Sequence, residues 1–153
     1  MKLGDVLKKE RKNKKLEVDA VADKLGIPPA EWETMEAGES PAEEWGPRLA
    51  QIAIELETPT SRLLADSGRF EDTKQGQAGG LIRKHRERRE KSEAELAEAV
   101  GISEEEYRKI EAGESELEVY GPRFLGFAEV IEQPVFNLFY PCGLPFQELD
   151  DYP

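Results

Sequence analysis

The chain contains few of the side chains from which catalytic or metal sites are built. It has one histidine, His85, and one cysteine, Cys142, among 153 residues. A single thiolate and a single imidazole cannot complete the four ligands of a structural zinc site, and no serine or second histidine accompanies His85 to form a nucleophilic pair. The glycine cluster at 77–80 lacks the strand-loop-helix context of a phosphate-binding loop. We therefore expect no catalytic residue, metal site, cofactor or small-molecule substrate, and a protein that is not an enzyme.

The charged side chains are more informative. The chain carries 33 acidic and 21 basic residues, and its formal charge of −12 opposes non-specific attraction to nucleic acid or to an anionic membrane. Twelve of the basic residues lie in two short segments, 8–15 and 83–91. Two interpretations of these segments stay open. They are either solvated helix faces, or surfaces that dock on an acidic partner such as a phosphate backbone or another copy of the chain.

The composition also bears on the cellular compartment. A single cysteine cannot form an internal disulfide, and no apolar run approaches the ~20 residues that span a bilayer. We expect a soluble, cytoplasmic protein with no membrane partner.

The elements that position these residues are repeated. When the chain is shifted by 75 positions, segments 25–27, 36–40 and 45–48 align without a gap on 100–102, 111–115 and 120–123, and 20 of 62 aligned pairs are identical. The sequence therefore predicts a first domain over 1–65, a polar linker over 66–77, a second domain over 78–140 and an extended tail over 141–153. Each copy is long enough to hold a core of its own.

The apolar residues of each copy follow a helical period, and no alternating strand pattern appears. The spacing predicts five helices per copy and an all-α fold. Gly26 is placed to end the second helix in a left-handed conformation, and Ser103 is a favourable N-cap. Trp32 and Tyr107 occupy equivalent positions, at which we expect core packing.

Two short helices separated by Gly-Ile, the second ending in Met-Glu or Ile-Glu before Ala-Gly, carry a resemblance to a known family. Over 3–64 and 78–139 the chain resembles a tandem of Cro/C1-type (XRE, phage-repressor) helix-turn-helix domains. The resemblance implies two duplicated five-helix, lambda-repressor-like domains. It also implies an ion pair between helix one and helix three of each copy, Arg11–Glu36 and Arg86–Glu111.

In this family the start of helix two and the face of helix three enter the major groove. The first copy has no cation on that surface. The second copy keeps Ser92, but Glu93 follows it, and three consecutive glutamates begin helix three. Arg108 and Lys109 are the donors that remain there. Because carboxylates repel phosphates and accept hydrogen bonds only from cytosine, the charge pattern disfavours DNA.

The sequence analysis thus favours a protein-binding regulatory or adaptor subunit, which binds a protein partner or self-associates. The residues expected to contact that partner are Glu31, Glu33, Glu104, Glu105, Glu106, Phe139, Tyr140 and Phe146. The alternative is a DNA-binding transcriptional regulator in which the two copies form a covalent pseudo-dimer. Its expected nucleic-acid contacts are Ser92, Arg108, Lys109, Lys8, Arg11, Arg83 and Arg86.

Overall fold

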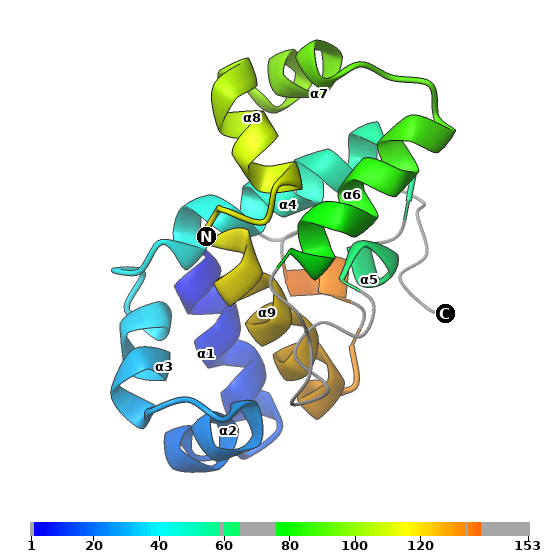
Figure 1. Cartoon of the computed structure of the whole chain (residues 1–153). Helices are drawn as coiled ribbons and strands as arrows, with labels where there is room; N and C mark the ends of the chain where they lie inside the picture. Colours follow the sequence, from blue (N-terminus) through cyan, green and yellow to red (C-terminus); the bar gives the residue numbers. More distant parts are fainter. Residues whose placement is uncertain (1, 59, 65–75, 134, 139–153) are drawn as a thin grey trace.

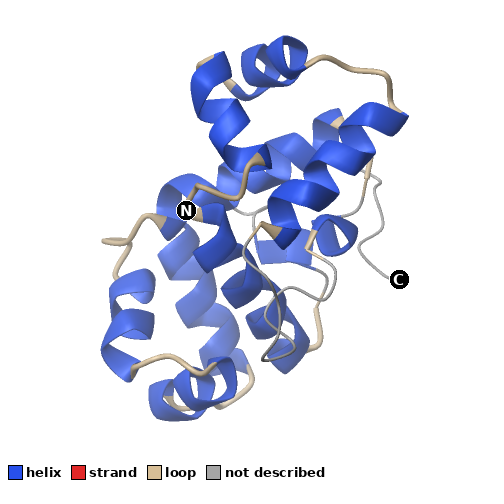
Figure 2. Cartoon of the chain, in the orientation of Figure 1, coloured by secondary structure: helices blue, strands red, loops and turns tan. Residues whose placement is uncertain are grey.

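The structure is a computed structural model that describes residues 2–58, 60–64, 76–133 and 135–138. All regular elements in these ranges are helices, as predicted, and no strand occurs among them (Figure 2). The elements are α1 (Leu3–Asn13), α2 (Val18–Leu25), α3 (Pro29–Glu36), α4 (Ala42–Glu55), α5 (Thr60–Leu63), α6 (Gln77–Arg88), α7 (Glu93–Val100), α8 (Glu104–Glu111), α9 (Leu117–Ile131) and the 3₁₀ helix η1 (Val135–Leu138).

Local sequence signals set the ends of these helices. Gly26 and Gly101 follow α2 and α7 with φ of 69° and 82°, a left-handed conformation that costs glycine little. Ser103 begins α8, and its hydroxyl accepts a hydrogen bond from the backbone N–H of Glu106. Both predictions, for Gly26 and for Ser103, are confirmed.

The elements recur along the chain at the offset of the repeat. α2 and α3 correspond to α7 and α8 with identical lengths, and α4 corresponds to α9. The fifth helix is α-helical in the first half, whereas η1 takes its place in the second. Equivalent residues therefore occupy equivalent positions in the described parts of both halves.

The fourth helices are exchanged between the halves. α9 packs against α2 of the first half, and α4 packs against α7 of the second. α4 and α9 also pack against each other, and Figure 1 shows both in the middle of the molecule, α4 toward the end with α7 and α8 and α9 toward the end with α2. The fifth elements also cross, since α5 contacts α6 and η1 contacts α1. Trp32 on α3 lies with its ring centroid 4.7 Å from that of Phe127 on α9.

This exchange joins the two halves into one hydrophobic core. A single cluster of buried side chains runs from Leu3 to Leu138 and includes Trp32, Tyr107 and Phe127, none of which is exposed. Trp32 and Tyr107 are core residues, as expected. The expectation that each copy holds a core of its own is wrong, because α4 and α9 carry equivalent apolar faces and each covers the other half.

The N-terminal end of each fourth helix remains bound to its own half. The Glu43 carboxylate on α4 accepts hydrogen bonds from the backbone N–H groups of Leu3 and Gly4, at 3.1 and 2.7 Å. The Glu118 carboxylate on α9 accepts equivalent bonds at the start of α6, from Gly76 and Gly79. Each exchanged helix is therefore held by its own half at its N-terminal end, and it also packs against the opposite half and against the other fourth helix.

The described residues include no helix that is both long and apolar enough to cross a membrane.

Candidate nucleic-acid interface

The helix-turn-helix of the second half consists of α7, a turn at Gly101–Ile102 and α8, which contact each other closely. α6 packs against α8 and supports it. An added Cβ at Gly79 of α6 would lie 2.2 Å from the backbone oxygen of Ile110, so the two backbones meet where a larger residue does not fit. Burial of Leu96, Tyr107 and Ile110 fixes the inner faces of α7 and α8. The outer face of α8 is thereby left exposed.

Two buried ion pairs attach the third helix of each half to the first. Arg11 donates to Glu36 at 2.6 and 3.0 Å, and Arg86 donates to Glu111 at the same two distances. The pKa of each guanidinium is raised, first by its hydrogen bond to the glutamate. Both ion pairs implied by the resemblance are thus confirmed. The guanidinium groups of Arg11 and Arg86 face inward, away from an outer ligand.

The aromatic residues of the third helices lie against these pairs. The indole N–H of Trp32 donates to the Glu36 carboxylate. Burial raises the pKa of the Tyr107 phenol, and the neighbouring Glu111 carboxylate adds to the effect. The phenol is therefore neutral at physiological pH and is part of the core.

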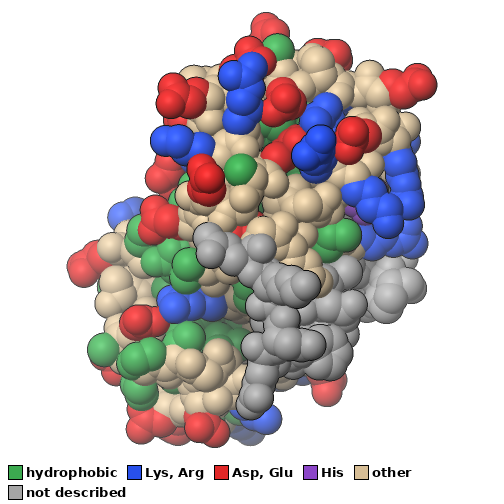
Figure 3. Space-filling view, viewed as in Figure 1, with side chains coloured by type: hydrophobic (Ala, Val, Ile, Leu, Met, Phe, Trp, Pro, Cys, Tyr) green, Lys and Arg blue, Asp and Glu red, His purple; other side chains and the backbone are tan. Residues whose placement is uncertain are grey.

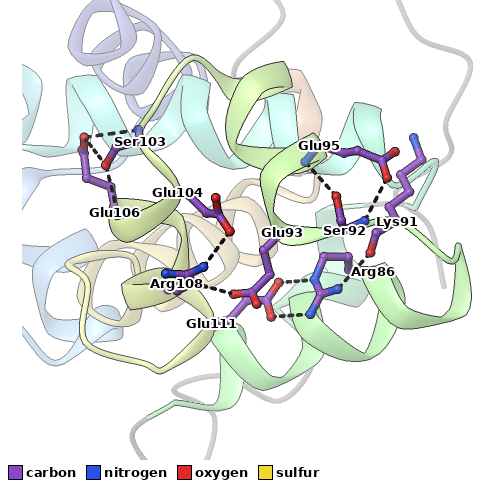
Figure 4. Close-up of polar contacts among 10 residues, drawn as sticks. All are labelled: Arg86, Lys91, Ser92, Glu93, Glu95, Ser103, Glu104, Glu106, Arg108 and Glu111. Carbon is purple, nitrogen blue, oxygen red and sulfur yellow. Dashed lines mark hydrogen bonds and ion pairs between the residues drawn. The ribbon is translucent and has the colours of Figure 1, made fainter.

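The three glutamates at the start of α8 have different surroundings, and Figure 4 shows those of Glu104 and Glu106. Glu106 caps the helix, since its carboxylate accepts from the Ser103 hydroxyl at 3.2 Å. Glu104 accepts from Arg108 at 2.6 Å, one helical turn further on. Glu105 is exposed. Two of the three carboxylates thus have local partners, and carboxylates at a helix N-terminus are also favoured by the helix dipole.

The donors expected for DNA lie on or beside the same surface. The Arg108 side chain is 59% exposed and contacts Glu104 and, at 3.8 Å, Glu93 at the start of α7. Lys109 is exposed. The Ser92 hydroxyl accepts from the backbone N–H of Glu95, so this residue caps α7. Arg108 therefore joins the exposed face of α8 to the N-terminus of α7.

The corresponding surface of the first half has a different partner. Glu31 on α3 accepts a hydrogen bond at 2.7 Å from Arg123 of α9, which also stacks over the ring of Tyr120. A cation is thus supplied to α3 by the opposite half, a contact that the sequence analysis did not predict. The repeat gave no signal for it, because the equivalent Arg48 pairs with Glu44 on its own helix.

The remaining expected contact residues are dispersed. Lys8 and Glu33 are exposed on α1 and α3, and Arg83 forms an exposed pair with Glu87 at 3.4 Å. Phe139, Tyr140 and Phe146 lie outside the described residues. No group of three or more histidine, cysteine, aspartate or glutamate side chains in the described ranges is arranged to hold a metal ion.

Comparison with known proteins identifies the helix-turn-helix. Residues 82–119, which include α7 and α8, match a family described as helix-turn-helix, of the Cro/C1 (XRE) type. Searches of curated proteins and of solved structures gave no significant match. The match favours a DNA-binding regulator, and the adaptor interpretation derived from the acidic charge is not supported.

Proposed function

We propose that the protein is a non-enzymatic DNA-binding regulator that reads base pairs through the outer face of α8. The observation that carries the proposal is the coincidence of the helix-turn-helix match at 82–119 with an exposed α8 face bearing Arg108 and Lys109. Arginine and lysine are the side chains that most often read guanine in the major groove. Both residues lie on the second helix of the unit, the helix that makes such contacts.

The ion pairs of Arg108 are compatible with this role. Its bonds to Glu104 and Glu93 lie at the surface, where a pair contributes roughly 0–1 kcal/mol. Exchange of a carboxylate for a base edge or a phosphate therefore requires little free energy. Glu104 and Glu106 lie in the first turn of α8, where the helix dipole favours carboxylates, and Glu106 also caps the helix.

We further propose that the first half is a second copy of the same unit and that the chain is a covalent pseudo-dimer. The 20 identities in 62 aligned pairs, the matching bounds of α2–α3 and α7–α8, and the two ion pairs of equal geometry support this. The domain limits proposed for the copies are 1–65 and 78–140. The exchanged fourth helices make these domains interdependent in folding.

Selection of duplexes from a random pool by the purified full chain tests the proposed function. We expect an enriched sequence, and Arg108→Ala and Lys109→Ala should each reduce discrimination by about 1–3 kcal/mol per lost base contact. Lys24→Ala, which removes an exposed cation at the C-terminal end of α2, is the control and should leave the selected sequence unchanged. If no sequence is enriched at low salt and a stoichiometric protein co-purifies from cell extract, the proposal is wrong and the adaptor interpretation returns.

A further inference from the structure

A compact group of cations lies where the two halves meet at α5 and α6. Arg62 of α5 and Lys84 and Arg88 of α6 are exposed, and we call these three residues the basic cluster. His85, the histidine of the chain, lies partly buried beside them. Figure 3 shows lysine and arginine side chains gathered around this histidine on the right of the molecule. The exchange of fifth elements creates the cluster, since Arg62 comes from the opposite half.

Cations dominate the described surroundings of His85. Burial lowers the pKa of His85, and the cations Arg88, Lys84, Arg62 and Arg89 lower it further. Each neighbouring cation outside the cluster has a carboxylate: Arg83 pairs with Glu87, Arg89 with Glu57, and Lys91 with Glu55. No carboxylate in the described ranges pairs with a member of the cluster. The cluster is therefore a local region of positive potential on a chain of net charge −12.

The repeat supplies an internal comparison for this region. The equivalent junction of α1 and η1 has Asn137, Glu10 and Asn13 at the positions that correspond in the repeat to Arg62, His85 and Arg88. Only Lys84 corresponds to another lysine, Lys9. These four positions of the first half thus carry almost no net positive charge. The packing of α5 on α6 does not require the cations, so a ligand is the better explanation for them.

The chemistry of the cluster fits phosphate. Two guanidinium forks and an ammonium group bind phosphate oxygens through charge-assisted hydrogen bonds, and arginine suits bidentate recognition of this group. Lys84 and Arg88 lie within the segment 82–119 that matches the helix-turn-helix family. α8 itself offers only Arg108 and Lys109 as cations beside three glutamates. Because phosphate contacts supply most non-specific affinity for DNA, cations outside α8 are needed.

We propose that Arg62, Lys84 and Arg88 form a phosphate-binding surface that holds the backbone of the same DNA whose bases α8 reads. This inference rests on the proposed function and deepens it. The two surfaces have different roles, since α8 discriminates between sequences and the basic cluster adds affinity for any sequence. Arg62 makes the first half a contributor to DNA binding by the second.

Titration of a labelled duplex with the full chain at several salt concentrations tests the inference. In the variant Arg62→Gln/Lys84→Gln/Arg88→Gln, we expect the slope of log affinity against log salt to become shallower by about 2.7, from three lost phosphate contacts. The loss of affinity should be equal for the selected duplex and for a duplex of scrambled sequence. The single variant Arg88→Gln should show about a third of this change in slope. Its result guards against a folding defect in the triple variant.

The matched control is Lys9→Gln/Lys12→Gln/Lys14→Gln, which removes three exposed cations of α1 and of the turn after it, and so gives the same net charge. Its slope should change by less than half as much. If the wild-type chain binds DNA and the cluster variants keep its slope, the inference is wrong and the proposed function stands. If the wild-type chain binds no DNA, both are wrong. If the cluster variants lose binding to polyglutamate but not to DNA, the ligand is an acidic protein instead.

Discussion

The contact between Trp32 and Phe127 allows a direct test of the exchanged core, because the two rings belong to opposite halves. We expect Phe127→Ala to lower the free energy of unfolding by about 3–5 kcal/mol, the usual range for a fully buried phenylalanine. For a chain of this size, that corresponds to a decrease of about 6–20 °C in Tm. The change is large beside a typical total stability of about 5–15 kcal/mol.

The assay uses the position of the tryptophans. Both tryptophans of the chain, Trp32 and Trp45, lie in the first half, so in a Trp45→Phe background the fluorescence reports the surroundings of Trp32 alone. Unfolding by urea should give one transition, and Phe127→Ala in the second half should shift it to lower urea. Val119→Ala, at an exposed position of the same helix, is the control and should change stability by less than about 0.5 kcal/mol. Two separate transitions, or an unchanged Trp32 transition, would refute the exchanged arrangement.

Three further predictions concern the second half. Gly79→Ala should destabilise the fold by about 1–3 kcal/mol in urea unfolding, because its Cβ would overlap a backbone oxygen of α8. Gly80→Ala, which has open space around it, should be neutral or stabilise the fold by up to about 1 kcal/mol. Glu111→Gln should cost about 3 kcal/mol by leaving a buried guanidinium without its charge partner, and Glu87→Gln, at an exposed pair, should cost less than about 1 kcal/mol by the same assay. Since the pKa of His85 is lowered in the folded state, the unfolded chain binds its proton more readily, and the free energy of unfolding should fall as pH decreases below about 6.5 and level off below the folded pKa. His85→Gln should remove that part of the pH dependence. A midpoint at or above about 6.5 in an NMR titration of His85 in the native protein would contradict the lowered pKa.

Much of the local structure could be predicted from the sequence. The glycine that ends α2, the serine cap of α8 and the two Arg–Glu pairs each depend on residues within one copy, and the sequence contains all of them. The contacts that cross between the halves could not be predicted. A helical period shows which face of α9 is buried, but not which half covers it, so the pairing of Arg123 with Glu31 had no signal.

The glutamates at the start of α8 show a second limit of prediction from the sequence, because one pattern of residues allows two interpretations. As three like charges, Glu104, Glu105 and Glu106 would repel a phosphate backbone. The pattern Ser103-x-x-Glu106 is also the signature of a capping box, and the sequence contains it. In the structure Glu106 completes that box and Glu104 binds Arg108. Glu104 and Glu106 therefore have structural roles at the start of the helix, which a count of charges does not reveal.

The exchange of fourth helices also determines how α3 and α8 are oriented relative to each other. Glu43 and Glu118 hold the starts of α4 and α9 on their own halves, while the bodies of these helices pack on α7 and α2 of the other. A rotation of one half against the other would break both sets of contacts and expose apolar surface of the shared core. The relative orientation of α3 and α8 is thus set by packing. The proposed pseudo-dimer would present its two surfaces in one fixed geometry, which suits a target with a defined spacing between half-sites.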